Sequence, residues 1–274
     1  MDEISVHNWN ELNDQLFAES WQEHLGRFRS TYAFRGMADA SVSLTTSLMR
    51  LGGDYKNLEG PMLRTFRRYA ERDVVSNDSV WNWLAVAQHH GLPTRLLDWT
   101  YSPYVALHFV TQDTACFDRD GVVLCLNYAA CARFLPPALK TILDEEDAYV
   151  FTAEMLTRGA GTLAEFDGLA ASPFVAFFEP PSLDQRIVTQ YALFSLMSDP
   201  TACLAGWLQD HQDLVRRIRI PAGLKREVRD KLDQANITER VLFPGLDGLS
   251  RWLKRYYSPS VVPGTQAPTT DLEL

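Results

Sequence analysis

Apolar residues recur at helical spacing in several separate segments of the chain. Residues three or four positions apart share one face of a helix. In one such segment the shared face carries Leu58, Met62, Leu63, Phe66, Tyr69 and Ala70. The spacing predicts a helical lead-in over residues 1–30 and helices over residues 58–70, 79–91 and 223–234. A further helix is expected to open at Ser102-Pro103, because a serine cap followed by proline is typical of a helix start.

Between these segments lie short runs that are rich in β-branched and aromatic residues. Such runs, bounded by Gly, Pro or polar residues, are typical of strands. We expect strands over residues 32–36, 94–100, 121–128, 174–178 and 190–197. Helices and strands are mixed without a regular alternation of strand, helix and strand. The pattern therefore predicts an α+β fold.

Composition narrows the class of protein. Of 274 residues, 46% are apolar and 22% are charged, so the chain can build a core. It contains no run of about 18 apolar residues and begins with an acidic, polar segment, so we expect neither a membrane span nor a secretory signal. The four cysteines lack C-x-x-C spacing, which favours reduced thiols in the cytoplasm over a disulfide framework or a metal site. Residues 258–274, with three prolines, are expected to be a disordered tail.

Charge is distributed unevenly along the chain. The net charge is −9, yet residues 214–257 contain 11 Lys and Arg against 5 Asp and Glu. A polyanion could dock on this basic segment by neutralisation of its phosphates. The alternative is a solvated helix face beside an acidic body.

Polar residues interrupt the apolar pattern at three places. In the first, Arg35 stands between Phe34 and Gly36. A guanidinium offers a planar fork to a phosphate and glycine allows close backbone approach, so this triplet is suited to a phosphate. The alternative is a buried arginine paired with a core carboxylate, for which Glu59 and Asp98 are candidates.

The second place is the block from residue 88 to 102, and the third is residues 186–194. In the block, His89 and His90 are adjacent and point in different directions, so at most one is expected to face a site. Arg95 and Asp98 are three apart on the expected strand and point to opposite faces. In the third segment, the Gln190 amide can bond a sugar hydroxyl or satisfy backbone groups.

Together these segments resemble the FRG domain family, which takes its name from the Phe-Arg-Gly triplet. The resemblance covers roughly residues 28–257, with residues 1–27 as lead-in. Met37 departs from the glutamine that the family often has there. The matching motifs are Phe34-Arg35-Gly36, Leu48-Met49-Arg50, Leu58-Glu59, the block from Gln88 to Phe109, Arg186-Ile187 with Gln190, and residues 242–249.

The FRG layout in turn is similar to the core of ADP-ribosyltransferases. This implies a mixed or antiparallel β core with a helical lobe, and NAD as the substrate. The resemblance implies that Arg35, His90, Asp98 and Gln190 are catalytic residues. The residues it implies for NAD binding are Arg35, Gly36, His89, Thr94, Arg95, Thr100 and Ser102.

The resemblance also implies a biological role. The chain would be a bacterial toxin or antiviral effector that transfers ADP-ribose to RNA or protein and is restrained by an antitoxin. Gln190 stands where these transferases carry a glutamate, and an amide brings neither negative charge nor a base. Asp98, Glu179 or His90 would then have to supply that function. The alternative is a non-catalytic module that binds a nucleotide and reports it to a partner.

Overall fold

The architecture of the chain was determined from a computed structural model, which describes residues 3–70, 75, 77–182 and 185–258. The strands are β1 (Glu3–Ser5), β2 (Trp21–Gln22), β3 (Arg27–Phe28), β4 (Tyr32–Met37), β5 (Leu97–Thr100), β6 (Gly121–Asn127), β7 (Val175–Phe178), β8 (Ala192–Met197) and β9 (Val215–Ile220). Apart from Ser258, the tail predicted for residues 258–274 lies outside the described residues.

Helices surround the strands. They are α1 (Trp9–Phe17), α2 (Glu59–Tyr69), α3 (Val80–His89), α4 (Pro103–Thr111), α5 (Tyr128–Cys131), α6 (Pro137–Glu145), α7 (Ala153–Gly159), α8 (Leu163–Asp167), α9 (Gln185–Thr189), α10 (Leu204–Trp207), α11 (Lys225–Gln234), α12 (Glu239–Leu242) and α13 (Leu246–Tyr257). The α+β class is therefore confirmed. No helix among the described residues is long and apolar enough to cross a membrane.

Seven of the strands form one mixed sheet in the order β1-β9-β6-β4-β5-β8-β7. The pair β1 and β9 is parallel, whereas the other neighbours are antiparallel. The ladder between β4 and β5 consists of a single registered pair, Phe34 and Thr100, while β4 and β6 pair along six residues. The sheet is consequently weakly joined between β4 and β5.

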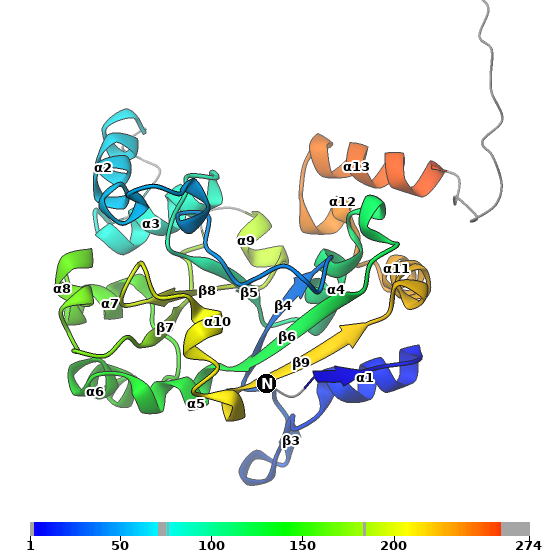
Figure 1. Ribbon diagram of the computed structural model, residues 1–274, viewed down its shortest axis with the longest axis horizontal. Coiled ribbons are helices and arrows are strands. Elements are labelled where there is room, and N and C mark those ends of the chain that lie inside the picture. Colours follow the sequence, from blue (N-terminus) through cyan, green and yellow to red (C-terminus); the bar gives the residue numbers. More distant parts are fainter. Residues whose placement is uncertain (1–2, 71–74, 76, 183–184, 259–274) are drawn as a thin grey trace, which may run out of the picture.

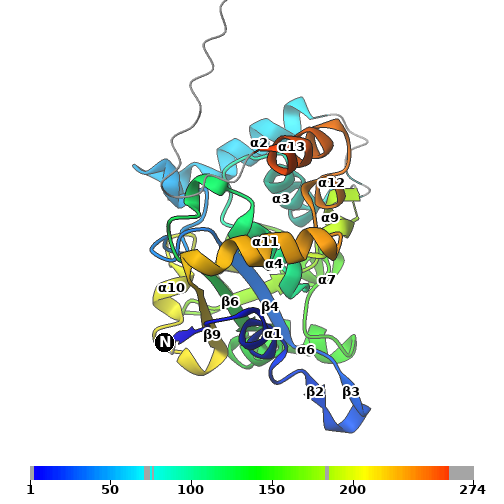
Figure 2. The same cartoon turned by 90° about the vertical axis from the view of Figure 1, so that its right-hand side faces the viewer.

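Alternating residues of the strands pack into different clusters on the two faces of the sheet. On one face, Phe34 and Val123 pack against α4, α11 and α1 through Leu107 and Val228. Figure 2 shows α4 and α11 lying along the sheet on that side. On the same face, Phe178 and Phe194 of β7 and β8 pack against helices α3, α6, α7 and α8 in a helical lobe. The opposite face carries one cluster, which includes Ala33, Trp99 and Phe177 and spans the β4–β5 junction. On the first face, the weak β4–β5 junction therefore lies between two differently packed halves.

Most of the expected elements are present. The helices predicted at residues 58–70, 79–91 and 223–234 are α2, α3 and α11, and Ser79 caps α3, accepting a bond from the Asn82 amide. Ser102 caps α4, accepting a bond from the Val105 amide ahead of Pro103 at the helix start. The strand predicted over residues 94–100 begins only at Leu97, and that predicted from Gln190 begins at Ala192.

The lead-in is only partly helical. Residues 9–17 form α1, but β1 pairs with β9 and extends the main sheet, and Trp21 lies in the small β2–β3 hairpin. A strand of three residues such as β1 is too short to show an alternating pattern of apolar and polar residues. Its pairing partner, β9, lies more than two hundred residues away in the sequence. The pairing with β9 is what makes it a strand.

The solvated helix face predicted for the first basic run is wrong, because Arg216, Arg217 and Arg219 lie on β9. Arg217 and Arg219 both bond to Glu3 of the neighbouring strand. Arg216 donates to the Gln15 and Ala18 carbonyls and stacks on the ring of Tyr32. These three arginines are therefore partly exposed but bonded to carboxylates or carbonyl oxygens within the chain.

Candidate functional site

A cavity of about 420 Å³ opens where β4 and β5 separate. Its walls come from β4, β5 and β8, the end of α3, the end of α4, and α9. The polar side chains that line it include Arg35, Gln88, His89, Asp98, Thr100, Arg186 and Gln190. Five residues expected at a site from the sequence, together with Gly36, therefore meet in one place: Arg35, His89, Asp98, Thr100 and Gln190.

Arg35 bridges the two diverging strands. Its Nη1 donates to the Asp98 carbonyl oxygen at 2.5 Å. Its Nε is buried and has no hydrogen-bond partner among the described residues. Burial lowers the pKa of the guanidinium. The negative charge of Asp98 raises this pKa, and the positive charge of Arg50 lowers it further. Arginine nonetheless stays protonated in proteins, so the cavity holds a cation with an unused donor.

Asp98 is held by an amide rather than by a cation. Both of its carboxylate oxygens accept from Gln88 Nε2 at 3.0 Å. Gln88 is oriented in turn by Thr94, whose hydroxyl donates to Gln88 Oε1 at 2.6 Å. This chain of bonds fixes the Asp98 carboxylate at the cavity, where its negative charge acts on the Arg35 guanidinium. A carboxylate so placed can stabilise developing positive charge or accept a proton.

Gln190 lies just before β8, at the end of α9. Its Nε2 donates to the Leu242 carbonyl oxygen of α12 at 2.9 Å. A carbonyl oxygen can only accept, so the nitrogen of the amide must face Leu242. A carboxylate at residue 190 would place an acceptor against an acceptor. The chain therefore has a local structural reason to carry glutamine here.

The remaining predicted residues serve other roles. His90 lies in a separate apolar groove between α2 and α3, whereas His89 lines the cavity, so only one of the two histidines faces it, as expected. Ser102 caps α4. The Thr94 hydroxyl accepts from the Leu96 amide and bonds to Gln88. These three side chains shape the surroundings of the cavity and do not line it.

Arg95 also lies away from the cavity, as the centre of a buried ion cluster. Its guanidinium is 5% exposed and bonds to Glu59 at 2.6 Å and to Asp167. The expectation that Arg95 and Asp98 point in different directions agrees with this placement, although Arg95 precedes the strand. The alternative considered for Arg35, a buried arginine paired with Glu59, is in fact the arrangement of Arg95.

Gly36 lines the cavity, but its missing side chain makes room for protein. A Cβ at Gly36 would lie 1.8 Å from the Ala106 carbonyl oxygen of α4. The glycine therefore lets α4 pack directly on β4.

We expect Gly36→Ala to destabilise the protein by about 1–3 kcal/mol or more, because α4 must move off the sheet. Chemical unfolding measures this. Gly223→Ala is the matched control, since a Cβ there meets nothing within 4 Å. Equal stabilities for the two variants would contradict the close contact.

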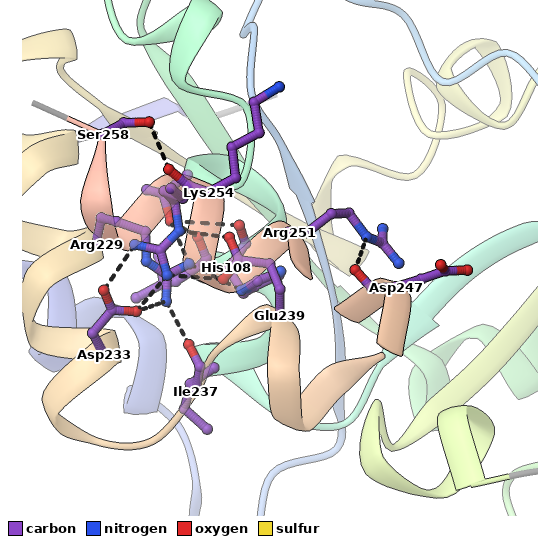
Figure 3. A network of polar contacts seen from close by, with 12 residues as sticks. His108, Arg229, Asp233, Ile237, Glu239, Asp247, Arg251, Lys254 and Ser258 are labelled. Carbon is purple, nitrogen blue, oxygen red and sulfur yellow. Dashed lines mark hydrogen bonds and ion pairs between the residues drawn. The ribbon is translucent and has the colours of Figure 1, made fainter. Parts of the chain in front are cut away.

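A cluster of charged residues holds the C-terminal helices that carry Leu242 (Figure 3). Arg255 of α13 bonds to Asp233 of α11 at 2.7 Å and to Glu239 of α12. Asp233 also bonds to buried Arg229, whose Nη1 lies 2.9 Å from His108 Nδ1 on α4. Because arginine only donates, His108 Nδ1 must accept, and the ring is neutral. The cluster ties α4, α11, α12 and α13 together behind Gln190.

His108 should make the stability of the protein depend on pH. Burial and the Arg229 charge lower its pKa from 6.5 to about 3. As the pH falls below 6.5, the unfolded chain binds a proton that the folded chain does not, so the free energy of unfolding decreases. From this one group the slope reaches about 1.4 kcal/mol per pH unit.

Urea unfolding between pH 7 and pH 5 measures this slope. His108→Asn retains an acceptor toward Arg229 but does not titrate, so we expect a flatter dependence. An unchanged slope in His108→Asn would show that another group is responsible.

Sequence reasoning did not assign several cavity residues. Gln88, Arg186 and Phe194 lie within the three polar segments but none of them is assigned to the site from the sequence, and Asp113 lies outside those segments. Arg186 lies with its guanidinium carbon 5.0 Å from the Phe243 ring centre at the rim. Only the fold brings α9 and α12 together. Within the described residues, no three His, Cys, Asp or Glu side chains are grouped so that they could hold a metal.

Comparison with known proteins bears on this arrangement. Neither the curated proteins nor the solved structures include a match to the chain. A family model described as the FRG domain matches residues 30–119. That range contains Arg35, Gly36 and the whole block from Gln88 to Ser102, while Gln190 lies beyond it. The resemblance to the FRG domain family found in the sequence is therefore confirmed over residues 30–119.

Proposed function

We propose that the cavity binds NAD⁺ and that the chain transfers ADP-ribose from it to a macromolecule. The observation that carries this proposal is the convergence of Arg35, Asp98 and Gln190 on one cavity. The Arg35 guanidinium, with its unused Nε, is suited to a pyrophosphate. Thr100 has a positioning role, because its hydroxyl donates to the Gln190 carbonyl oxygen at 2.7 Å.

In the proposed reaction, the bond between the nicotinamide nitrogen and the anomeric carbon of the ribose breaks. Nicotinamide leaves with the electron pair of that bond, and a nucleophile of the acceptor bonds to the same carbon. Asp98 stabilises the positive charge on the ribose and takes the proton released by the nucleophile. Gln190 cannot do either, because its amide carries no charge and its nitrogen is bonded to Leu242.

Incubation with NAD⁺ carrying separate labels on adenine and nicotinamide tests this function. Transfer predicts free nicotinamide together with adenine label on protein or RNA, and both should be absent in Asp98→Asn. Binding without release of nicotinamide would favour a second candidate, a non-catalytic nucleotide-binding module. The observation favouring that module is the amide at residue 190 in place of a carboxylate.

We infer further that the chain acts in the cytoplasm as a toxin or antiviral effector that an antitoxin protein restrains. Transfer of ADP-ribose to an essential macromolecule would harm the cell that makes it, so restraint by a partner is needed. Expression of the chain alone should arrest growth, and expression of Arg35→Ala should not. If both forms are equally toxic, the toxicity does not depend on this cavity.

A further inference from the structure

Two arginines from different helices share one aromatic ring at the rim of the cavity. The guanidinium carbon of Arg186 in α9 lies 5.0 Å from the centre of the Phe243 ring, and that of Arg251 in α13 lies 4.3 Å from it. Phe243 is buried and packs edge-on against Phe109, and both Phe109 and Arg186 line the cavity. The Phe243 ring therefore brings two positive charges together beside the cavity.

No carboxylate of the described residues forms a salt bridge with either arginine. Arg251 Nε donates to the backbone carbonyl oxygen of Asp247 at 3.3 Å, whereas Arg255 of the same helix forms salt bridges with two carboxylates. Arg186 and Arg251 are both exposed, so an anion can reach them from solvent. Two like charges near one ring repel each other, and an anion bound to both offsets this repulsion. The arrangement therefore favours binding of an anion at the Phe243 ring.

Positive charge continues along α13. Lys254 follows Arg251 by three residues and Tyr257 follows Lys254 by three, and residues at this spacing share one face of a helix. Figure 3 shows the Lys254 side chain pointing away from the cluster of charged residues. Tyr257 is 77% exposed. Asp247 lies on the same face, but in the described part of the chain its carboxylate forms no salt bridge. We call Arg186, Arg251, Lys254 and Tyr257 the basic track.

The side chains of the basic track select the class of ligand. A guanidinium offers a planar fork of N–H donors that matches the oxygens of a phosphate. An exposed tyrosine ring offers a face on which a base can stack. A single-stranded nucleic acid carries both phosphates and accessible bases, whereas an acidic peptide has no base for Tyr257. Because the net charge of the chain is −9, other parts of its surface repel such a strand.

We propose that the basic track binds a single-stranded nucleic acid and that this strand is the macromolecule that receives ADP-ribose. Arg186 belongs both to the track and to the wall of the cavity. A strand whose phosphate is bound by Arg186 and Arg251 therefore lies at the cavity rim, beside the proposed NAD⁺ site. The role of the strand as acceptor rests on the proposed function, whereas binding of the strand does not depend on NAD⁺.

Fluorescence anisotropy of the full chain with a labelled twelve-nucleotide oligouridylate tests the proposal, and an oligothymidylate of equal length distinguishes RNA from DNA. Arg251→Ala should weaken binding about three- to tenfold, as expected for loss of one charged hydrogen bond to a phosphate. The slope of log affinity against log salt concentration should become shallower by about 0.7, the contribution of one phosphate of a single strand. Tyr257→Ala should weaken binding about fivefold or more without changing this slope, because stacking involves no phosphate. Arg68→Ala is the matched control, since Arg68 of α2 is exposed and also lies on a tyrosine ring, and it should have no effect.

A (Gly-Glu)₄ peptide and calorimetry with NAD⁺ complete the test. The proposal is overturned if neither oligonucleotide binds, if their binding ignores Arg251→Ala, or if the acidic peptide binds as tightly as they do. Arg251→Ala should leave the affinity for NAD⁺ unchanged, because Arg251 does not line the cavity. Loss of NAD⁺ affinity in this variant would assign Arg251 to the NAD⁺ site and overturn the track. Failure of NAD⁺ to bind the unaltered chain would reject the proposed function and leave the oligonucleotide result standing.

Discussion

Arg35→Ala is expected to weaken NAD⁺ binding by about 30-fold or more. The Arg35 guanidinium reaches across the gap between β4 and β5, and its buried Nε has no partner among the described residues. Loss of one partner of a buried charge pair costs about 2–5 kcal/mol, and each 1.4 kcal/mol is a factor of ten in affinity. Isothermal calorimetry with NAD⁺ measures the change directly.

Two further variants test whether the loss of NAD⁺ affinity is specific to the Arg35 guanidinium. Arg35→Lys keeps the charge but loses the planar fork, so its affinity should fall between that of Ala and that of the unaltered chain. Arg119→Ala removes an exposed arginine that pairs with Asp39, and it should leave the affinity unchanged. A folded Arg35→Ala variant with normal affinity would remove this residue, and with it the proposed phosphate contact, from the site.

Arg95→Met is expected to destabilise the protein by about 3–5 kcal/mol. Arg95 joins Glu59 of α2 to Asp167 of α8, and Glu59 is only 3% exposed. Burial lowers the pKa of Arg95, but the two carboxylates outweigh this and raise it. Removal of the arginine leaves a buried carboxylate without its counter-charge, which is the costly case for an ion pair.

Urea unfolding with two comparison variants checks this expectation. Arg158→Met removes an arginine that also pairs with two carboxylates but is 46% exposed, and it should cost less than about 1 kcal/mol. A Glu59→Met change added to Arg95→Met should restore part of the stability, because no unpaired charge then remains buried at that position. If Arg95→Met and Arg158→Met lower the free energy of unfolding by similar amounts, burial of the ion pair does not determine the cost.

These two arginines illustrate how far the sequence could be interpreted. Both stand in conspicuous motifs, and both were expected to contact NAD. Arg35 stands next to a glycine and Arg95 stands in the polar block of residues 88–102. Both are arginines in polar motifs, so the sequence does not show which of them lines the cavity. Arg95 differs because Glu59 and Asp167 lie beside it in the folded chain, and each is distant in the sequence.

The basic run on β9 shows a similar limit. Val215, Ile218 and Ile220 are buried, while Arg217 and Arg219 reach neighbouring carboxylates, an arrangement typical of a strand. The density of positive charge in this run indicates a solvated helix face or a polyanion-binding segment, and the strand pattern of its apolar residues is less conspicuous. Glu3, the partner of two of these arginines, joins β9 through the pairing of β1, which no local pattern indicates.

The sequence by itself determined helices α2, α3, α4 and α11, strands β4 to β8 of the main sheet, the cap at Ser102, and the residue types available for chemistry, whereas it did not indicate α5 to α10, α12 or α13. Periodicity and capping depend on residues only a few positions apart, so they can be recognised along the chain. The tertiary structure alone decided that Arg35, Asp98 and Gln190 share a cavity and that His90 lies in a separate groove. Those outcomes depend on how far β4 and β5 diverge and on contacts between distant segments, such as Gln190 with Leu242, which exist only once the whole sheet has formed.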